Sequence, residues 1–231
     1  MTINVYWACI GKHWMQASAP ESVRSTLREK DIADGNRMTH IHRCPAFNDH
    51  LRNVFTLKSI YDYDLSFSGN SLGSHMYDQE FFDEMITVRS MENRFISYNM
   101  QYIFFTEEES LKTSFYEFPF LEDNDFTKKC IIFPGVYDIG KWFRNTELAF
   151  ILKPEHNSLN IKQGDVYSYM RFHTDESINF IQFRYNNLLD EYKNDGFNMT
   201  FFEPRVKLLN YYKLQKNKKL ILKEIKNNIV D

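Results

Sequence analysis

The sequence Tyr61-Asp-Tyr-Asp-Leu-Ser-Phe-Ser68 alternates bulky apolar residues with acidic or small polar ones. Successive side chains of a strand point to opposite faces, so the two tyrosines, Leu65 and Phe67 share one face, and the aspartates and serines share the other. This pattern predicts a strand with one buried and one solvated face. The turn-forming pair Gly69-Asn70 follows directly and predicts the end of the strand.

Other segments have the same β-forming composition, and they are residues 95–105, 129–133, 157–161 and 166–172. The first is long and aromatic, and the second stops at Pro134-Gly135. Lys162-Gln-Gly-Asp165 separates the last two segments and predicts a tight turn that joins them as neighbouring strands. Gly164 supplies the positive φ that such a turn often requires.

Residues 178–185 are predicted to form a strand of a different kind, because both of its faces carry bulky side chains. Ile178 and Phe180 fall on one face, whereas Ile181 and Phe183 fall on the other. A strand with two bulky faces is typical of a position between two layers.

Helical signals occur in three segments. Residues 20–30 begin with a proline that suits the first position of a helix. Residues 187–193 are expected to form a short helix that ends near Gly196. Residues 206–230 repeat apolar residues at helical spacing with lysines between them, which predicts an amphipathic helix. The polar interruption at residues 216–219 allows either two shorter helices or one bent helix.

Short turns between the strands, without regular intervening helices, favour antiparallel sheets. Aromatic residues make up 16% of the 231 residues, and two facing sheets would bury them. We therefore predict a mainly β fold, an antiparallel β-sandwich of the jelly-roll type, with a closed barrel as the alternative. Residues 1–200 are assigned to this β-rich domain, and residues 201–231 to an amphipathic helical extension.

Composition limits the class of protein. Hydrophobic residues make up 43% and charged residues 26%, which excludes a disordered tail and a membrane bundle. No apolar stretch approaches the roughly 18–20 residues that cross a bilayer, and the N-terminal segment lacks the basic region of a signal peptide. The net charge of −3 argues against a protein whose affinity comes mostly from phosphate contacts.

The three cysteines, Cys9, Cys44 and Cys130, lie far apart and are odd in number, so they cannot form a complete disulfide framework. Free buried thiols in a reducing cytosol are the interpretation that we favour. Cys44 has His42 and His50 near it in the sequence, and the alternative is a nucleophile in an electropositive, partly exposed setting.

Histidine spacing gives two candidate metal sites. His40 and His42 have the spacing of a cupin-type site, but no carboxylate follows where that pattern needs one. His173 and Asp175 have the HxD spacing that supplies two ligands of the facial triad in non-haem iron oxygenases. No histidine follows His173 to complete the triad. We favour a turn stabilised by Thr174 and Asp175, keep His173 and Asp175 as candidate metal ligands, and predict no cofactor.

Other catalytic motifs are missing from the sequence, which contains no GxSxG, GxxxxGK[ST], GxGxxG or HExxH. The acidic group Glu107-Glu-Glu109 and the pair Asp62 and Asp64 have oxygen ligands for a cation, although solvation satisfies both. We assign no catalytic residue, and the sequence inclines towards a protein that is not an enzyme.

Trp142-Phe-Arg144 follows Gly140 and combines an aromatic with a guanidinium side chain. Exposed Trp and Arg residues dominate the binding energy of many protein interfaces, so Trp142 and Arg144 are candidate binding residues. In the alternative, Trp142 closes one end of the sandwich core and Arg144 extends into solvent.

Lysines are concentrated between residues 213 and 226, where Glu224 is the only acidic residue. A solvated helix face is the interpretation that we favour. Asn210-Tyr-Tyr-Lys213 combines aromatic and basic side chains in a way that suits single-stranded nucleic acid. The negative net charge and the lack of an RNP-like motif make nucleic acid an unexpected partner.

Three pairs of short motifs occur in order along the chain, and they are Arg43-Cys-Pro-Ala-Phe47 with Lys58-Ser-Ile-Tyr-Asp-Tyr-Asp64, Ile132-Phe-Pro-Gly135 with Trp142-Phe-Arg144, and Ile161-Lys-Gln-Gly-Asp165 with Met170-Arg-Phe172. Over roughly residues 40–185 the chain resembles a family of similar length from tailed bacteriophages, marine ones especially, and from bacteria, which carries a domain-of-unknown-function label. The resemblance implies a phage origin and a β-rich fold. It implies no catalytic residues.

Three functions are therefore open. The first is a non-enzymatic bacteriophage protein, either a minor virion component or a host-interaction factor, that acts through contacts with a protein partner or by self-association. The second is a jelly-roll, metal-dependent oxygenase of the non-haem iron type, or a small-molecule-binding enzyme. The third is a single-stranded nucleic-acid binder. We expect no membrane partner, and a location in the host cytoplasm or the virion.

Overall fold

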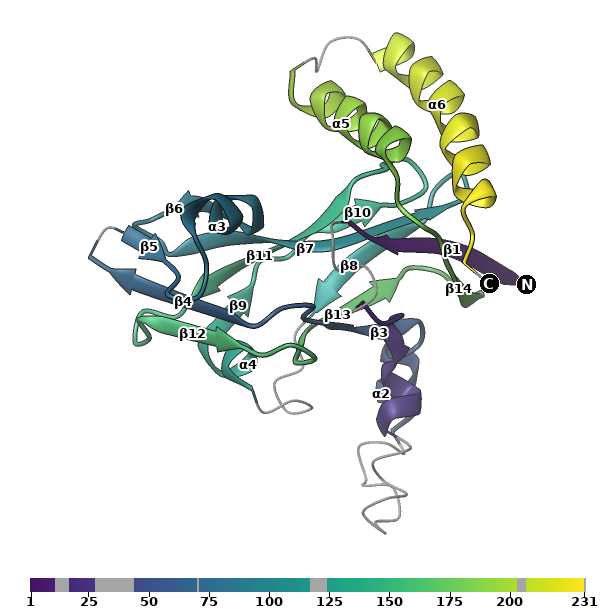
Figure 1. The fold of residues 1–231 in the computed structure, drawn as a ribbon. Helices are drawn as coiled ribbons and strands as arrows, with labels where there is room; N and C mark the ends of the chain where they lie inside the picture. Colours follow the sequence, from purple (N-terminus) through teal and green to yellow (C-terminus); the bar gives the residue numbers. More distant parts are fainter. Residues whose placement is uncertain (11–16, 28–43, 70, 117–123, 203–206, 231) are drawn as a thin grey trace.

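The structure, a computed structural model, describes residues 1–10, 17–27, 44–69, 71–116, 124–202 and 207–230 (Figure 1). It is mainly β. The first sheet has six strands, in the order β14 (Ser177–Gln182), β1 (Thr2–Cys9), β7 (Phe95–Thr106), β11 (Asn145–Leu152) and β9 (Cys130–Ile132), with β6 (Ile86–Ser90) also paired to β7.

Two smaller sheets complete the β structure. The second sheet has five strands, in the order β10 (Val136–Asp138), β8 (Lys112–Tyr116), β13 (Val166–Phe172), β3 (Val54–Lys58) and β2 (Glu21–Ser22). The third sheet has three strands, in the order β12 (Ser158–Ile161), β4 (Tyr63–Ser68) and β5 (Ser71–Gly73).

The second and third sheets are two parts of one long antiparallel ribbon. β3 continues into β4, and their respective partners are β13 and β12. Between the two sheets the ladder gives way to irregular hydrogen bonds, in which Ser59 N donates to Asp165 O and Gly164 N donates to Ser59 O. The second and third sheets therefore form one continuous layer of the molecule.

Aromatic side chains hold this layer against the six-stranded sheet. Tyr98 of β7 contacts Tyr63 of β4 and Tyr167 of β13, with ring centroids 4.8 and 5.5 Å apart. Phe104 of β7 contacts Phe172 of β13 at 6.5 Å. All five rings belong to one buried apolar cluster. The predicted burial of alternate aromatic residues between layers of strands is confirmed.

Helices cover the outer faces of the strand layers. α5 (Asn187–Phe202) and α6 (Lys207–Asn227) lie over the six-stranded sheet, whereas α2 (Pro45–His50) lies by β3 on the opposite side (Figure 1). The short helices α3 (Gln79–Met85) and α4 (Asp125–Lys129) follow loops and contribute Phe82, Met85 and Phe126 to the central core. Side-chain caps start both, because Asp78 accepts from Phe81 N and Asn124 accepts from Thr127 N.

Most of the predicted strands are present, and residues 178–185 lie as expected between two apolar clusters. Ile178 and Phe180 pack on the central core, whereas Ile181 and Phe183 pack under the C-terminal helices. Gly164 has a φ of 87°, as predicted. The predicted pairing across it is wrong, because β12 and β13 have different partners, β4 and β3. The sequence favoured antiparallel sheets, but β1 and β14 are parallel.

The helical predictions also need correction. Residues 21–22 form β2, and only residues 23–27 of the predicted first helix are helical in the described part of the chain. The helix predicted for residues 187–193 is α5, which continues through Gly196 to Phe202. The domain boundary expected at residue 200 therefore lies inside a helix. The predicted C-terminal helix is α6, a single helix.

In the described parts of the chain, no helix combines the length and the apolar character that a bilayer crossing requires.

Candidate functional site

The outer face of the six-stranded sheet has two halves with opposite chemistry. In the covered half, Tyr6 and Ala8 of β1 and Ile103 and Phe105 of β7 form one apolar cluster with residues of α5 and α6. In the open half, the same face of β7 carries Ser97 and Asn99, and the neighbouring strands add further polar side chains, namely Thr87, Arg89, Asn145 and Glu147.

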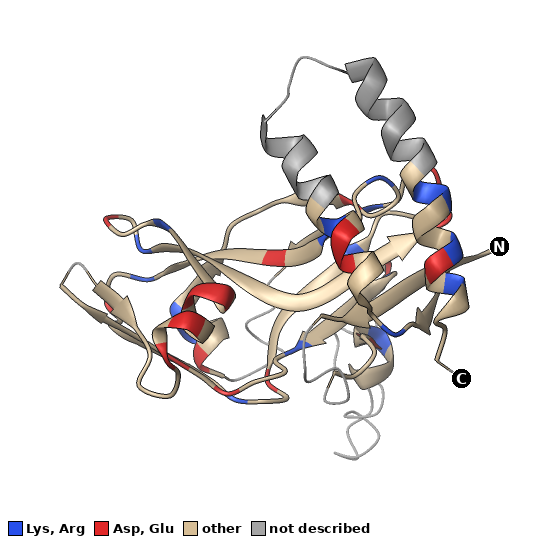
Figure 2. Ribbon diagram, turned by 45° about the horizontal axis from the view of Figure 1, so that its top comes forward, with Lys and Arg blue, Asp and Glu red and all other residues tan. Residues whose placement is uncertain are grey.

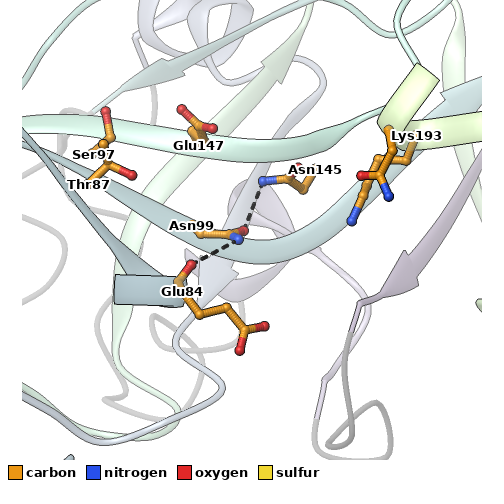
Figure 3. A pocket seen from close by; sticks show the side chains of 8 residues that line it. Glu84, Thr87, Ser97, Asn99, Asn145, Glu147 and Lys193 are labelled. Carbon is orange, nitrogen blue, oxygen red and sulfur yellow. Dashed lines mark hydrogen bonds between the residues drawn. The ribbon is translucent and has the colours of Figure 1, made fainter. Parts of the chain in front are cut away.

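A polar cleft with a volume of about 240 Å³ lies in the open half (Figure 3). Side chains from the sheet form its floor, and α3 and α5 border it. Its lining consists of Glu84, Thr87, Ser97, Asn99, Asn145, Glu147, Lys193 and Asn194. All eight are polar, which is unusual because ligand pockets are mostly apolar with a few polar groups. The cleft therefore suits a ligand rich in hydrogen-bonding groups.

A distortion of β7 positions the floor of the cleft. Asn145 pairs with Ile103, but Glu147 pairs with Asn99, so β7 has two more residues than β11 in this interval. Gln101 lies in the bulge with a φ of 58°, a left-handed conformation that non-glycine residues rarely adopt. Its backbone N donates to Asn99 Oδ1 at 3.2 Å. Bulges and strained residues of this kind are concentrated next to functional sites.

Two amides meet at the centre of the floor (Figure 3). Asn145 Nδ2 donates to Asn99 Oδ1 at 3.0 Å, and Asn99 Nδ2 donates to Glu84 O at 3.5 Å. These bonds fix both side chains, since Asn99 Oδ1 also accepts a hydrogen bond from the backbone N of Gln101 in the bulge. Each amide has a second N–H, and Asn145 keeps its own oxygen, so a ligand meets donors and an acceptor in fixed positions.

Glu147 and Lys193, two of the three charged residues that line the cleft, are held in ion pairs. Glu147 lies between two guanidinium groups, with Arg89 Nη2 2.9 Å from Oε2 and Arg144 Nη2 3.2 Å from Oε1. Lys193 Nζ lies 2.7 Å from Asp190 Oδ1. The Glu84 carboxylate points away from Glu147 (Figure 3). Each of the three cations, Arg89, Arg144 and Lys193, therefore already has a carboxylate partner.

An apolar margin, formed by Phe95, Ile131, Phe133 and Ile151, adjoins the cleft on the same face. Phe95 and Ile131 both pair with Ile151, and the rings of Phe95 and Phe133 are 4.9 Å apart. Phe133 is 51% exposed and Ile131 is 47% exposed. Phe95 lies two residues before Ser97 on β7, a distance of about 7 Å along a strand. The margin and the cleft therefore form one continuous surface.

Of the two candidate binding residues, Trp142 and Arg144, it is Arg144 that contacts a residue lining the cleft. Trp142 is 39% exposed, and Phe143, which follows it, is the residue that packs into the covered half. Arg144 does not extend into solvent, because its pairing with Glu147 leaves the side chain only 19% exposed. The structure connects Arg144 to the cleft through Glu147.

The candidate metal ligands His173 and Asp175 point to different partners. His173 Nε2 lies 2.7 Å from Ser114 Oγ, whereas Asp175 pairs with Arg52 at 3.2 Å. Burial and the nearby charges of Arg171 and Lys112 lower the pKa of His173. His40 and His42 lie outside the described residues. Within the described ranges, no group of three His, Cys, Asp or Glu residues is arranged to hold a metal ion.

The cysteines differ in exposure. Cys9 and Cys130 are buried, as predicted, and burial raises the pKa of Cys9 to about 12. Cys44 is exposed at the start of α2, so the prediction of a buried thiol is wrong for this residue. His42, which the sequence places near Cys44 as a possible partner of a nucleophilic thiol, is not among the described residues.

The basic C-terminal run is partly engaged in intramolecular contacts. Lys218 Nζ donates to Glu108 O and Gly140 O, and Lys226 Nζ lies 3.0 Å from Glu107 Oε1. Residues of both charge signs appear on the described end of α6 (Figure 2). The side chains of Asn210-Tyr-Tyr-Lys213 are outside the described part of the structure. Two of the lysines thus bind α6 to the loops that follow β7 and β10, which differs from a fully solvated helix face.

The cleft could not be predicted from the sequence, because its lining comes from three strands and two helices that lie in separate parts of the chain. One signal was present. Ser97 and Asn99 place two polar side chains on one face of a largely apolar strand.

Comparisons of the chain with protein-family models, with curated proteins and with solved structures gave no match. The description of the site therefore depends on the geometry alone.

Proposed function

We propose that this protein is a non-enzymatic binding protein, and that its binding surface is the polar cleft with the adjoining apolar margin. The observation that carries the proposal is the cleft itself, which presents fixed amide and hydroxyl groups while Glu147 and Lys193 are held in ion pairs. Such a surface holds a ligand through directed hydrogen bonds, and the exposed rings beside it add apolar contact.

The arrangement of the carboxylates supports binding instead of catalysis. General acid–base chemistry needs a side chain that is free to exchange a proton with the substrate. Both oxygens of Glu147 are engaged by arginines, and the carboxylate of Glu84 points away from Glu147, so the two carboxylates do not form an acid–base pair (Figure 3). Neither histidine nor cysteine is present among the eight lining residues that the structure describes. The described lining of the cleft thus offers positions for a ligand but no two carboxylates arranged to act together on it.

The biological setting remains as the sequence suggested it. A minor virion component or a host-interaction factor of a bacteriophage is a setting in which a non-enzymatic binding protein would act, and this setting rests on the sequence resemblance. A jelly-roll topology rests on the strand pattern of the sequence in the same way. The proposed binding surface requires neither.

A ligand screen by thermal shift tests the proposed function. The library contains four classes of small molecule: uncharged polar, anionic, cationic and apolar. Wild type is compared with Asn145→Ala, which removes an amide from the cleft floor, and with the control Asn160→Ala, which removes an exposed amide from β12 in the other layer. We expect uncharged polar compounds to raise the melting temperature of the wild type and of Asn160→Ala, but not that of Asn145→Ala.

Two results would contradict the proposal. One is the absence of any stabilisation that depends on Asn145. The other is chemical conversion of a stabilising compound by the wild-type protein, detected by mass spectrometry, because conversion would identify an enzyme.

A further inference from the structure

We propose that the ligand of the cleft is a neutral saccharide, bound by its hydroxyl groups in the cleft and by its C–H face on the apolar margin. This inference rests on the proposed function and names the class of ligand. It has three supports, which are the donor and acceptor pattern of the floor, the pairing of the charges, and the position of the exposed rings.

The first support is the chemistry of the amides. A sugar hydroxyl both donates and accepts a hydrogen bond, so it is matched best by groups that offer both functions at close range. Asn99 and Asn145 meet at 3.0 Å. Thr87, which is paired with Ser97 across β6 and β7, adds an exposed hydroxyl group, whereas Ser97 Oγ already accepts from Arg89 Nε at 3.0 Å. Adjacent hydroxyls on a sugar ring would meet this row of alternating donors and acceptors.

The second support is charge. A sugar phosphate or a nucleotide is recognised by arginine or lysine side chains that are available for the anion. Here Arg89 and Arg144 are both paired with Glu147, and Lys193 is paired with Asp190. An anion would compete with these carboxylates for the cations, whereas a neutral ligand leaves the pairs undisturbed.

The third support is the apolar margin. Phe133 is half exposed, and its backbone N donates to Ala149 O of β11. Ala149 is in turn paired with Ser97 of β7, so Phe133 lies level with Ser97 at a distance of two strands. Two strand spacings correspond to about 10 Å. The electron-rich face of an aromatic ring attracts the polarised C–H groups of a pyranose. A ligand of two or more sugar units would reach from the cleft to this ring.

The position of the cleft argues against a peptide. Extended peptides are commonly bound at the edge of a sheet, where free backbone groups give main-chain hydrogen bonds. The floor of the cleft is the face of β7 and β11, whose backbone groups are paired with each other. Recognition here depends on side chains, which suits hydroxyl groups.

Ligand-observed NMR and titration calorimetry with named sugars test the inference. The probes are glucose, galactose, mannose and N-acetylglucosamine, with the disaccharides maltose and cellobiose to measure the effect of a second unit. Glucose 6-phosphate and glucuronate test charge, and a neutral hexapeptide tests the alternative macromolecular class. Circular dichroism confirms the fold of each variant.

The expected result is saturable binding of at least one neutral sugar. A single hydrogen bond corresponds to an affinity change of roughly tenfold, so Asn145→Ala and Thr87→Val each weaken binding by about that factor. Phe133→Ala lowers the affinity for a disaccharide more than the affinity for a monosaccharide. The controls Asn160→Ala and Met76→Ala, the second being as exposed as Phe133, leave the affinity unchanged.

The other outcomes overturn the inference in distinguishable ways. Tighter binding of glucose 6-phosphate or glucuronate contradicts a neutral ligand, and binding of the peptide alone contradicts a saccharide. Binding of an uncharged compound that is not a sugar, lost in Asn145→Ala, overturns the saccharide but keeps the proposed function. If no compound of any class binds in a manner that depends on Asn145, both proposals are wrong.

Discussion

The covered and open halves of the six-stranded sheet share the strand β7 but differ in what lies on their outer face. Where β7 presents Ile103 and Phe105, helices α5 and α6 lie across it and complete an apolar cluster. Where the same face presents Ser97 and Asn99, the described helices leave a polar cleft. Apolar outward residues gain free energy from a permanent cover, whereas polar ones are already satisfied by water and by each other. The difference separates a structural surface from a candidate binding surface.

The boundary between the halves is a feature of the backbone. The bulge around Gln101 lies between Asn99 and Ile103, and the O atom of Gln101 accepts from Ile10 N, just after the end of β1. β6 pairs with the opposite end of β7. Two strands thus share one edge of β7 at different positions, and Asn99 on the cleft floor lies between the two paired segments.

The largest expected effect concerns the covered half. Ile225 of α6 is fully buried against this cluster, so Ile225→Ala should lower the free energy of unfolding by about 2–5 kcal/mol. Leu220→Ala on the same helix removes a side chain that is 41% exposed and should cost no more than about 0.5 kcal/mol. Urea denaturation measures both. Equal effects would show that α6 does not pack on the sheet through this face.

A smaller effect is expected at the boundary. Gln101→Val places a β-branched residue at a φ of 58° and should destabilise the protein by about 2 kcal/mol. Gln101→Gly relieves the backbone strain while it removes the buried contact with Met85, and it should remain within about 1 kcal/mol of wild type. Thermal and urea unfolding compare the pair. Similar losses in both variants would mean that the bulge is not strained at this residue.

The smallest effect is pH-dependent and concerns the attachment of α6. Hydrogen bonds from the Tyr6 hydroxyl, 2.6 Å from Oε1, and from Lys226 hold the pKa of Glu107 below its usual value of 4.5. A carboxyl with a depressed pKa stabilises the fold above its unfolded-state pKa, and this contribution is lost as the pH falls through its folded-state value. For an exposed pair it should not exceed about 1 kcal/mol.

The variant Glu107→Gln isolates this contribution. The difference in unfolding free energy between wild type and the variant should be present at pH 6 and above, and should shrink as the pH falls below about 4.5. A difference that stays constant, or grows, on acidification would contradict the assigned role of Glu107.

Strand positions were predictable because side-chain alternation is local. Residues 61–68 contain β4, and residues 95–105 correspond closely to β7. Pairing was less predictable, since the turn at Gly164 has the expected φ yet lies within a long ribbon instead of closing a hairpin. A positive φ specifies the local backbone path, but it does not specify which strands lie on either side.

The candidate site could be predicted only in fragments. Arg144 was predicted to bind a partner because it lies close to Trp142 in the sequence. The structure connects it to the cleft through Glu147, a residue that no motif indicated. His173 and Asp175 were selected by spacing, and the fold directs them to Ser114 and Arg52. Spacing along a chain predicts shared chemistry only when the backbone between the residues is regular.

The sequence by itself determined which segments are extended, which faces are apolar and that the C-terminus is an amphipathic helix, because periodicity depends on residues that are close in the chain. The tertiary structure alone decided that the helices cover one half of a sheet and that Glu84, Asn99, Glu147 and Lys193 border one cleft. Such groups come together because burial of apolar surface selects the packing of the whole chain, and the polar residues are carried to positions that local sequence does not encode.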